Sequence, residues 1–529
     1  MEIQRNSNGT CIGRVNFLKS MQAGLSQPSH DRFIANLMAR LQLNKKPSVI
    51  FQKRDRSCKR VLYTLVALEP EAIVTIDDRR AKLLLADGTE KTTENIACPF
   101  AFLETIKESY GGLPADLEQM DFAKNLNFAG GLIGYMGYGL TSRIENIRKQ
   151  AQDPFLIPDA TLMIPNLILN FDHENDELLI VSHKGSGPLE EIRHQLLSES
   201  DKAHEARSTL ARDLSKKQVV RSREVANLDI EAALKTGFLR SSMTKGEFIN
   251  RVLKAKEHIL EGDAFQIVVS QRFFGSVKSD AASIFANLCK AAPSAYNFMI
   301  NLPDFQYLGA SPETMLSVNL GVARLCALAG TRPRGLTPRQ DELNEQELSS
   351  NEKEMAEHLM LVDLARNDLG KVCAPGTINV GPVAQVLRYS NVMHLGTEVF
   401  GTLESDRTTL SALRACFPRG TVSGAPKVRA MQILSELEPE RRGPYAGAVG
   451  FIDRRGNLDT AIAIRSALIK DGIAHINAGA GIVYDSDPEA EYMETINKAR
   501  AITQAVFGLQ DEQETKQHLS EPELRRGVI

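Results

Sequence analysis

The 529-residue sequence lacks several features that define whole classes of protein. Its seven cysteines include no C-x-x-C pair, which argues against zinc sites and a disulfide framework, so we expect free thiols. No uncharged apolar run reaches the roughly 18 residues of a membrane helix, and the opening MEIQRNSNGT lacks a signal-peptide core. Lys plus Arg (63) nearly balance Asp plus Glu (66), so there is no general attraction to nucleic acid or anionic membranes. We therefore expect a cytoplasmic protein that binds neither.

The chain divides into two large regions and a tail. Residues 1–225 hold short apolar runs between polar turns, which predict strands in an antiparallel or mixed sheet. A highly charged connector from Ser198 to about Ile230 leads into residues 226–508, where helical and strand patterns alternate. There Thr244, with Glu247 three residues later, predicts the cap of a helix. Residues 509–529 are polar, and we expect a frayed tail.

The segment GAGIVYDSDPEAEYMETINKA, which begins at Gly479, carries the strongest chemical pattern. Gly479, Ala480 and Gly481 would let a ligand carboxylate reach backbone N–H groups. Asp487 and Pro488 predict a helix start, since Asp accepts from free N–H groups and Pro has none to leave unpaired.

Glu491 and Glu494 follow three residues apart, so their carboxylates lie about 60° apart on that helix and can converge on one point. The alternative for the whole segment is a Gly-rich turn followed by an acidic first turn that only complements the helix dipole. Glu354 and Glu357 repeat the spacing on another predicted helix, and opposed carboxylate pairs suit Mg²⁺ holding an anionic ligand.

Two further motifs are incomplete. GTCIG around Cys11 superficially matches a glutaminase nucleophile elbow, but only polar residues precede it, where a buried strand is needed. GTVSGAPK has Pro426 and Val428 beside Lys427, which breaks the P-loop pattern and removes the best nucleotide-binding candidate.

Single residues in the second region each have a structural and a functional interpretation. Gln266 and His394 are by default structural, and Glu313 by default is an exposed turn glutamate, although it could act as a general acid. Gly330 and Thr331 end an apolar strand where backbone and hydroxyl contacts to a ligand are natural. Arg465 lies in an apolar strand, and a buried Arg requires an anionic partner.

Together, six segments resemble the large subunit, component I, of anthranilate synthase. They are ALAGTRPRG, AEHLMLVDLARNDLG, RYSNVMHL, RGTVSGAPKVRAM, GPYAGAVG and GAGIVYDSDPEAEYMETINKA. The resemblance is dense from about Ser241 to Val506 and looser before it. It implies an α+β fold, a four-layer α/β/β/α arrangement around an orthogonal β-sandwich, with the active site in the carboxy-terminal part.

The resemblance also implies roles for individual residues. Glu357 and Glu494 would hold Mg²⁺, with Glu354 and Glu491 near them. The implied catalytic residues are Glu313 as general acid, His394 and Thr421 in pyruvate elimination, Gln266, and Lys498 neutralising the acidic cluster. The implied chorismate contacts are Gly330, Thr331, Tyr445, Arg465, Gly479, Ala480 and Gly481.

Two positions separate the reactions of this superfamily. The isochorismate branch has a lysine where Gln266 stands, and the 4-aminobenzoate branch has one where Ala329 stands. The absence of both favours anthranilate formed from chorismate and ammonia. A synthase that stops at aminodeoxyisochorismate, or 4-amino-4-deoxychorismate synthase component I, is the alternative. The sequence shows no amidotransferase half, so we expect ammonia from glutamine through a separate glutaminase subunit.

The resemblance suggests weak tryptophan inhibition as well. Feedback-sensitive relatives carry Leu-Leu-Glu-Ser and Pro-Tyr-Met segments in the tryptophan pocket; here IFQKRD places Lys53 near the serine, and the triplet is Ala295, Tyr296 and Asn297. Repulsion of tryptophan's ammonium by Lys53, with a lost hydrogen bond and lost apolar surface, would weaken binding roughly a hundredfold.

Overall fold

The computed structural model describes residues 2–5, 11–16, 30–55, 57–110, 126–150, 152–197, 229–389 and 392–508. The predicted connector after residue 197 and the tail from 509 lie outside these ranges, apart from the start of α7. Helices and strands combine with one hydrogen-bonded, predominantly antiparallel sheet system, in agreement with the predicted α+β class. Among the described helices, none is both long and apolar enough to cross a membrane.

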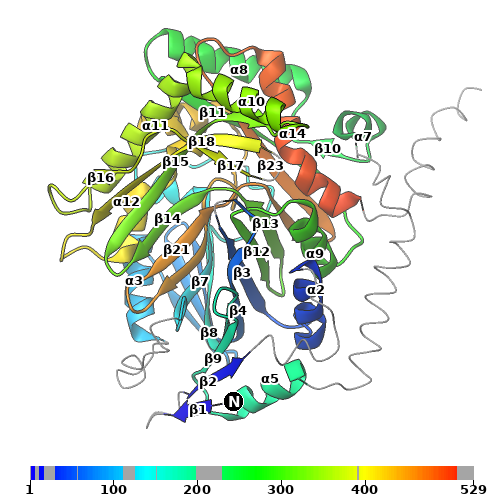
Figure 1. Ribbon diagram of the computed structural model, residues 1–529, viewed down its shortest axis with the longest axis vertical. Helices are drawn as coiled ribbons and strands as arrows, with labels where there is room; N and C mark the ends of the chain where they lie inside the picture. Colours follow the sequence, from blue (N-terminus) through cyan, green and yellow to red (C-terminus); the bar gives the residue numbers. More distant parts are fainter. Residues whose placement is uncertain are drawn as a thin grey trace, which may run out of the picture.

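The strands are labelled as in Figure 1. Their bounds are β1 Glu2–Arg5, β2 Cys11–Asn16, β3 Ser48–Arg54, β4 Val61–Asp77, β5 Arg80–Leu85, β6 Glu90–Thr93, β7 Gly131–Met136, β8 Ala160–Asp172, β9 Glu177–Ser182, β10 Arg240–Ser241, β11 Gln266–Ser276, β12 Tyr296–Asn301, β13 Gln306–Ser311, β14 Thr314–Asn319, β15 Val322–Pro333, β16 Asn379–Val380, β17 Gln385–Arg388, β18 Val392–Thr402, β19 Gly424–Ala425, β20 Ala448–Asp453, β21 Leu458–Ile462, β22 Ser466–Lys470 and β23 Ile473–Ile482.

The α-helices are α2 His30–Leu41, α3 Pro99–Ser109, α5 Gly187–Leu197, α7 Ile230–Thr236, α8 Lys245–Leu260, α9 Ala281–Ala291, α10 Pro338–Ser350, α11 Glu352–Gly370, α12 Thr409–Cys416, α13 Lys427–Leu437 and α14 Pro488–Phe507. The 3₁₀ helices η2 and η3 span Tyr138–Arg143 and Gly420–Val422. Helix α8 begins as its sequence predicts, because Thr244 and Glu247 form a reciprocal capping box.

Three apolar clusters establish the layers. The middle cluster contains only strand and loop residues, such as Phe51 and Phe451, whose rings meet edge to face at 5.9 Å. A second cluster packs α8, α9 and α14 on strands through residues such as Phe248, Phe285 and Ile496. A third packs α3, α11 and α12 on other strands. Strands facing strands in the centre, with helices on both outer sides, give an α/β/β/α arrangement (Figure 1).

Strands of the two predicted regions pair directly with each other. Phe51 of β3 lies opposite Phe298 of β12, and Ile133 of β7 lies opposite Phe451 of β20. The boundary near residue 225 lies outside the described ranges, so the predicted division is not tested by these pairings.

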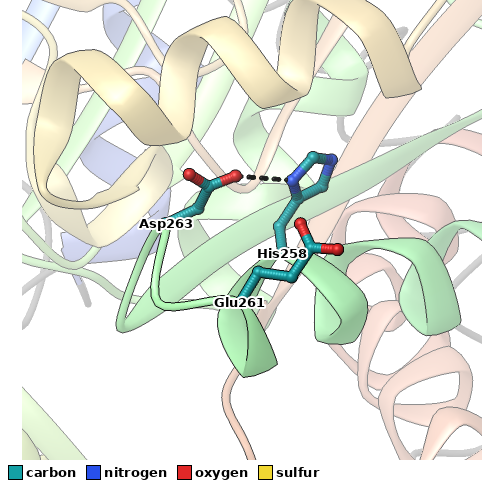
Figure 2. A group of neighbouring side chains, drawn as sticks. All are labelled: His258, Glu261 and Asp263. Atoms are coloured by element: carbon teal, nitrogen blue, oxygen red, sulfur yellow. Dashed lines mark hydrogen bonds and ion pairs between the residues drawn. The ribbon is translucent and has the colours of Figure 1, made fainter.

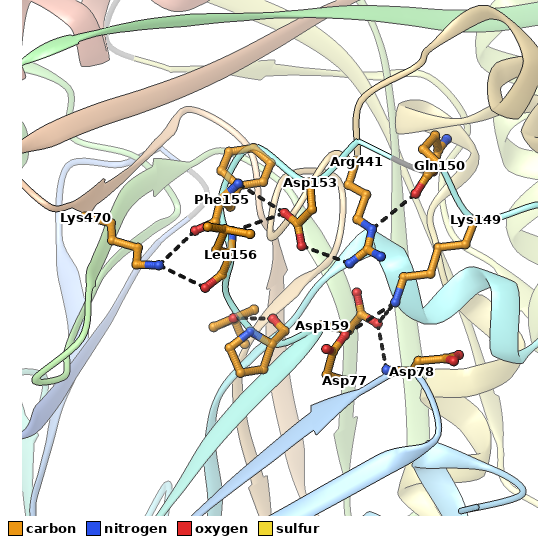
Figure 3. A network of polar contacts seen from close by, with 12 residues as sticks. Asp77, Asp78, Lys149, Gln150, Asp153, Phe155, Leu156, Asp159, Arg441 and Lys470 are labelled. Atoms are coloured by element: carbon orange, nitrogen blue, oxygen red, sulfur yellow. Dashed lines mark hydrogen bonds and ion pairs between the residues drawn. The ribbon is translucent and has the colours of Figure 1, made fainter.

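Polar contacts tie the segment between residues 149 and 159 to the carboxy-terminal half (Figure 3). Arg441 donates to the Gln150 carbonyl at 3.2 Å and to Asp153 at 2.9 Å. Lys470 donates to the carbonyls of Phe155 and Leu156. Both cations belong to segments that flank the candidate site described next.

Candidate functional site

The two predicted glutamate pairs lie in the first two turns of α11 and α14. Asn351 accepts from the Glu354 N–H at 3.1 Å and caps α11. Asp487 accepts from the Ala490 N–H at 2.8 Å, and Pro488 is the first residue of α14, as predicted. Local capping chemistry therefore fixes where each carboxylate pair begins.

The four carboxylates share one electrostatic environment. Burial raises the pKa of Glu357, and Glu354 and Glu494 raise it further, against a hydrogen bond from Gln266. Burial also raises the pKa of Glu491, where Glu494 again adds to the effect and Ser486 opposes it. Glu494, on α14, thus acts on one carboxylate of each helix.

Each carboxylate has a polar neighbour, yet the group carries excess negative charge. Gln266 donates to Glu357 at 3.0 Å, and Arg332 donates to Glu354 at 2.9 Å. Lys498 pairs with Glu494 at 2.5 Å and also donates to the Gly479 carbonyl at 3.0 Å.

One carboxylate oxygen stands out. Ser486 donates to Oε1 of Glu491 at 2.6 Å, whereas Oε2 of Glu491 is buried without a hydrogen bond among the described residues. A buried carboxylate oxygen without a donor, beside other carboxylates, fits a hard divalent cation such as Mg²⁺.

A second cluster of potential metal ligands lies at the end of α8: His258, Glu261 and Asp263 (Figure 2). Asp263 accepts from Arg429 at 2.6 Å and lies 2.8 Å from Nδ1 of His258, while Glu261 is exposed. Because a guanidinium already neutralises Asp263, we regard this group as a surface ion-pair network.

Glu313, predicted as either an exposed turn residue or a general acid, is only 8% exposed between β13 and β14. Thr421 of η3 donates its hydroxyl proton to Oε1 of Glu313 at 2.9 Å. Burial raises the pKa of Glu313 to about 7, against the opposing effects of Arg419, Thr421 and Lys498. A carboxyl group with this pKa holds a proton near neutral pH and can donate it.

His394 is oriented by the end of β15. Its Nδ1 lies 2.8 Å from the Gly330 carbonyl and 3.1 Å from the Thr331 hydroxyl. A carbonyl oxygen only accepts, so we assign the proton to Nδ1, which leaves Nε2 as a free base. Burial lowers the pKa of His394, with Arg465 adding to the effect and the Gly330 contact opposing it. The imidazole is therefore neutral at pH 7.

The prediction that Arg465 lies within a strand is wrong, because Arg465 is in the connection between β21 and β22. Arg465 acts electrostatically on His394, and Tyr445 acts on Arg465. Burial lowers the pKa of Arg465, while Tyr445 and Glu494 oppose that effect. Within the described residues, the Arg465 guanidinium makes no hydrogen bond, although its backbone carbonyl accepts from Ala310. The anionic partner predicted for a buried Arg is therefore not a hydrogen-bonded carboxylate of the described chain, and the free donors suit an anionic ligand.

Gly479, Ala480 and Gly481 form the end of strand β23, opposite β11, and not a turn. The Val268 N–H donates to Ser423 at 3.0 Å, away from β23, so Val268 and its partner Gly481 form a non-hydrogen-bonded pair. The N–H groups of Gly481 and, two residues earlier, Gly479 consequently point away from β11, on the side where Lys498 meets the Gly479 carbonyl.

The small residues are required by close neighbours. A Cβ on Gly479 would lie 2.8 Å from the Tyr445 hydroxyl, and one on Gly481 would lie 2.9 Å from Nε2 of Gln266. Gly330 has φ of +64°, and a Cβ there would lie 3.1 Å from Oε2 of Glu354. The three glycines therefore let the predicted site residues approach one another.

The predicted altered tryptophan pocket is divided between two faces of a sheet. Lys53 lies opposite Tyr296 in the β3–β12 pair, whereas Asn297 lies opposite Gln52, so the alternation of side chains puts Asn297 on the other face. Ala295 precedes this ladder and accepts from the Arg54 N–H at 2.8 Å.

Lys53 also differs from the free repelling ammonium that we expected. It forms an ion pair with Asp459 at 2.5 Å and lies 5.3 Å from the centre of the Tyr296 ring. Tyr63 and Tyr296 donate to the same carboxylate at 2.8 and 2.9 Å. Burial alone would lower the pKa of Lys53, but Asp459 and Tyr296 outweigh it and raise the pKa above its usual value. The charge of Lys53 is neutralised within the fold.

Several neighbours of the site carried no signal that sequence reasoning used. They are Lys353, Arg332, Arg419 and Asp459, which contact or influence Glu357, Glu354, Glu313 and Lys53. Arg332 and Arg419 lie within motifs that the sequence analysis used for other residues, so these motifs could have indicated them.

Cys11 is buried at the start of β2 in an antiparallel ladder with β1 and β9, which is not a nucleophile elbow. All seven cysteines lie among the described residues, and none of them forms a disulfide, as expected.

Comparisons with known proteins agree with the family resemblance found in the sequence. The family model for chorismate binding enzymes matches residues 48–504. Anthranilate synthase component 1 of Acetivibrio thermocellus is 37% identical over 447 residues, covering 84% of this chain and 87% of the relative. The corresponding protein of Geobacillus stearothermophilus is 35% identical, with coverages of 93% and 96%. The crystal structure of anthranilate synthase component I from Streptococcus pneumoniae TIGR4 matches with a TM-score of 0.66 and 32% identity, covering 83% of this chain and 92% of that one. This chain therefore belongs to the anthranilate synthase component I family of chorismate-binding enzymes.

Proposed function

We propose that this chain, an enzyme of the lyase class, converts chorismate and ammonia into anthranilate, pyruvate and water in a Mg²⁺-dependent reaction. The observation that carries the proposal is Glu313, a buried acid with a pKa of about 7 that is hydrogen-bonded to Thr421. Replacement of the ring hydroxyl by ammonia requires a proton on the leaving oxygen, and Glu313 is protonated at the pH where that proton is needed.

The metal ligands in this proposal are Glu357 and Glu494, with Glu354 and Glu491 beside them. The raised pKa values of Glu357 and Glu491 and the unpaired oxygen of Glu491 support a cation there. When bound, Mg²⁺ would neutralise these carboxylates and hold the ring carboxylate of chorismate. Lys498 offsets part of the negative charge through Glu494.

The remaining contacts would orient chorismate. Arg465, whose guanidinium makes no hydrogen bond to any described residue, would bind the enolpyruvyl carboxylate. The outward N–H groups of Gly479 and Gly481 would bind a carboxylate oxygen. Ala480, between them, is paired with Val269 of β11 and is buried in the apolar cluster that packs α8, α9 and α14 on the strands. Tyr445 and the Gly330–Thr331 backbone would enclose the ring.

The second step eliminates pyruvate from an aminodeoxyisochorismate intermediate, which requires removal of a ring proton. Neutral His394 would be the base, because its Nδ1–H is held by the Gly330 carbonyl and its Nε2 makes no hydrogen bond to the described residues. Thr421 would assist through the proton it shares with Glu313.

Neither Gln266 nor Ala329, at the two positions where related enzymes carry a lysine, has a basic nitrogen in its side chain. Gln266 donates an amide N–H to Glu357, so its side chain cannot activate water as a lysine would. Ala329 is 8% exposed and offers no nucleophile. These residues favour anthranilate over isochorismate and over 4-amino-4-deoxychorismate.

Ammonia would come from glutamine through a separate glutaminase subunit, because Cys11 lacks the setting of a nucleophile. Tryptophan would inhibit weakly or not at all. The Lys53–Asp459 ion pair supports weak inhibition. The resemblance places tryptophan at this position, which is occupied here by the neutralised Lys53 ammonium and by the hydrogen-bonded side chains of Asp459, Tyr63 and Tyr296.

The proposal is tested by incubating the purified chain with chorismate, Mg²⁺ and ammonium and separating the products by chromatography. Anthranilate and pyruvate are expected. Accumulation of aminodeoxyisochorismate would assign the shorter reaction, and 4-amino-4-deoxychorismate or isochorismate would contradict the roles of Ala329 or Gln266. Complete inactivity would contradict the proposal as a whole.

A further inference from the structure

Arg442 is a charged side chain that the reaction itself does not use, although it is only 2% exposed. It follows α13 in the segment that leads to Tyr445. Its Nε donates to Oε2 of Glu438 at 2.7 Å, and its Nη2 donates to Oε1 at 2.8 Å. Glu438 is itself 4% exposed, so this is a buried, bidentate ion pair.

The other hydrogen bonds of the guanidinium reach two segments of the site. Nη1 donates to the Val422 carbonyl at 2.7 Å, next to Thr421 in η3. Nη2 donates to the Val268 carbonyl at 2.7 Å, in the residue of β11 that lies opposite Gly481. One planar group therefore holds the strand pair β11–β23 and the 3₁₀ helix at a fixed separation.

Two tyrosine rings and the Glu438 carboxylate make further contacts around the Arg442 guanidinium. The guanidinium carbon lies 4.7 Å from the centre of the Tyr138 ring and 5.8 Å from that of Tyr445. Oε1 of Glu438 accepts from the backbone N–H and the hydroxyl of Ser270, at 2.8 and 2.9 Å. Each nitrogen of the guanidinium and each oxygen of the Glu438 carboxylate has at least one hydrogen-bond partner, which favours one geometry for the ion pair.

We propose that Arg442, held by Glu438, is a positioning residue that sets the geometry of Thr421, the Gly481 strand and Tyr445 relative to one another. It touches none of the reacting groups. Replacing a buried ion pair by apolar side chains of similar size is often neutral or favourable for stability, so stability alone does not account for this arrangement. The inference rests on the proposed function for its catalytic consequence.

The contact with Val422 gives the inference a specific consequence. Without it, η3 is free to shift, and the 2.9 Å hydrogen bond from Thr421 to Glu313 lengthens. Arg419, the residue before η3, would move as well. Arg419 and Thr421 both hold down the pKa of Glu313, so that pKa would rise above its present value of about 7.

The experiment compares Arg442→Met/Glu438→Leu, Arg442→Lys and Arg441→Met. The double variant removes both charges together and leaves no unpaired buried ion. Arg441→Met is the matched control, since Arg441 is the adjacent arginine and binds Asp153 and Gln150 instead of the site (Figure 3). Melting temperature, chorismate affinity by calorimetry, kcat/KM and its pH profile are measured for each.

For the double variant we expect a melting temperature close to that of the control but a kcat/KM about a hundredfold lower, as for a small misplacement of catalytic groups. The fall of kcat/KM at alkaline pH should occur at a higher pH in the double variant than in wild type. Thr421→Val should show the same displacement, whereas Arg441→Met should keep the wild-type pH profile. Arg442→Lys keeps the positive charge but loses the planar guanidinium that donates to two oxygens at once. Its kcat/KM should lie between those of the wild type and the double variant.

A folded double variant with wild-type kcat/KM and an unmoved alkaline limb would overturn the inference. If the double variant does not fold, Arg442→Lys decides by the same readouts. If the wild type forms no anthranilate, the proposed function fails separately, and chorismate binding decides: weaker binding in the Arg442 variants than in Arg441→Met supports positioning, and equal binding refutes it.

Discussion

The hydroxyl group of Thr421 donates a hydrogen bond of 2.9 Å to Glu313, joining η3 to the turn between β13 and β14. This contact joins residues that are 108 positions apart in the chain. Because burial raises the pKa of Glu313 to about 7, the pair presents a protonated acid near neutral pH.

The first prediction concerns the acid form of Glu313. A general acid works when protonated, and the protonated fraction falls as pH rises through about 7, so kcat/KM should fall above neutrality. Glu313→Gln should lower kcat by about 10²–10⁴ and remove that limb. A variant that keeps its rate, or an unchanged limb, would assign the proton to another group.

The second prediction is a pH-dependent gain in stability for the same variant. The folded-state pKa of Glu313 is raised, so the folded protein binds more protons than the unfolded chain between the ordinary value of 4.5 and about 7, and its stability falls as pH rises through that window. Glu313→Gln should therefore be more stable than wild type by about 3 kcal/mol at pH 8 and similar at pH 4. Denaturant unfolding without metal or substrate measures the stability of both proteins at each pH. Equal stabilities of wild type and Glu313→Gln at pH 8 would contradict the burial of a titrating carboxyl group.

The third prediction concerns the carboxylate group. Glu357→Gln and Glu494→Gln should abolish turnover and weaken Mg²⁺ binding measured by calorimetry, since each removes a hard ligand. Glu489→Gln is the control, because Glu489 lies in the first turn of α14 but pairs with Lys245 at the surface. Full activity in a chelator, or a folded Glu357→Gln that binds Mg²⁺ as the wild type does, would remove the metal assignment.

The fourth prediction separates ammonia use from glutamine use. The isolated chain should form anthranilate with ammonium and none with glutamine, since Cys11 is buried in a strand ladder. Cys11→Ala should have no effect on the ammonium reaction. Glutamine-dependent anthranilate formation that this substitution abolishes would show that Cys11 is a nucleophile after all.

The fifth prediction is weak or absent inhibition by tryptophan. An incoming ammonium would have to compete with Lys53 for Asp459 in a buried network that is already satisfied. Ammonia-dependent activity should be unchanged by micromolar tryptophan, and calorimetry should detect no binding. Inhibition competitive with chorismate would show that a pocket survives beside this pair.

The parts of the fold that follow from short stretches of sequence could be predicted. The caps of α8 and α14 depend on residues within one turn, and Thr244, Asp487 and Pro488 perform the expected roles. The two glutamate pairs follow from helical spacing in the same way. Sequence alone, however, does not give the tertiary arrangement that places Glu494 of α14 near enough to Glu357 of α11 to raise its pKa.

The remaining features depend on pairings between distant strands. Lys53 meets Asp459 across 406 positions, which turns an expected repulsive charge into a neutral pair. The β3–β12 register puts Asn297 on the face opposite Tyr296, although the two are adjacent in sequence. Gly479 and Gly481 look like turn residues, but the strand needs them because Tyr445 and Gln266 come too close for a side chain.

The most direct test of the proposed function is the stoichiometry of products from chorismate, Mg²⁺ and ammonium, with anthranilate followed by fluorescence and pyruvate by a coupled assay. The proposed reaction predicts equal amounts of anthranilate and pyruvate for each chorismate consumed, with no product when the metal is chelated. Consumption of chorismate without anthranilate, or pyruvate released with a different aromatic product, would contradict it.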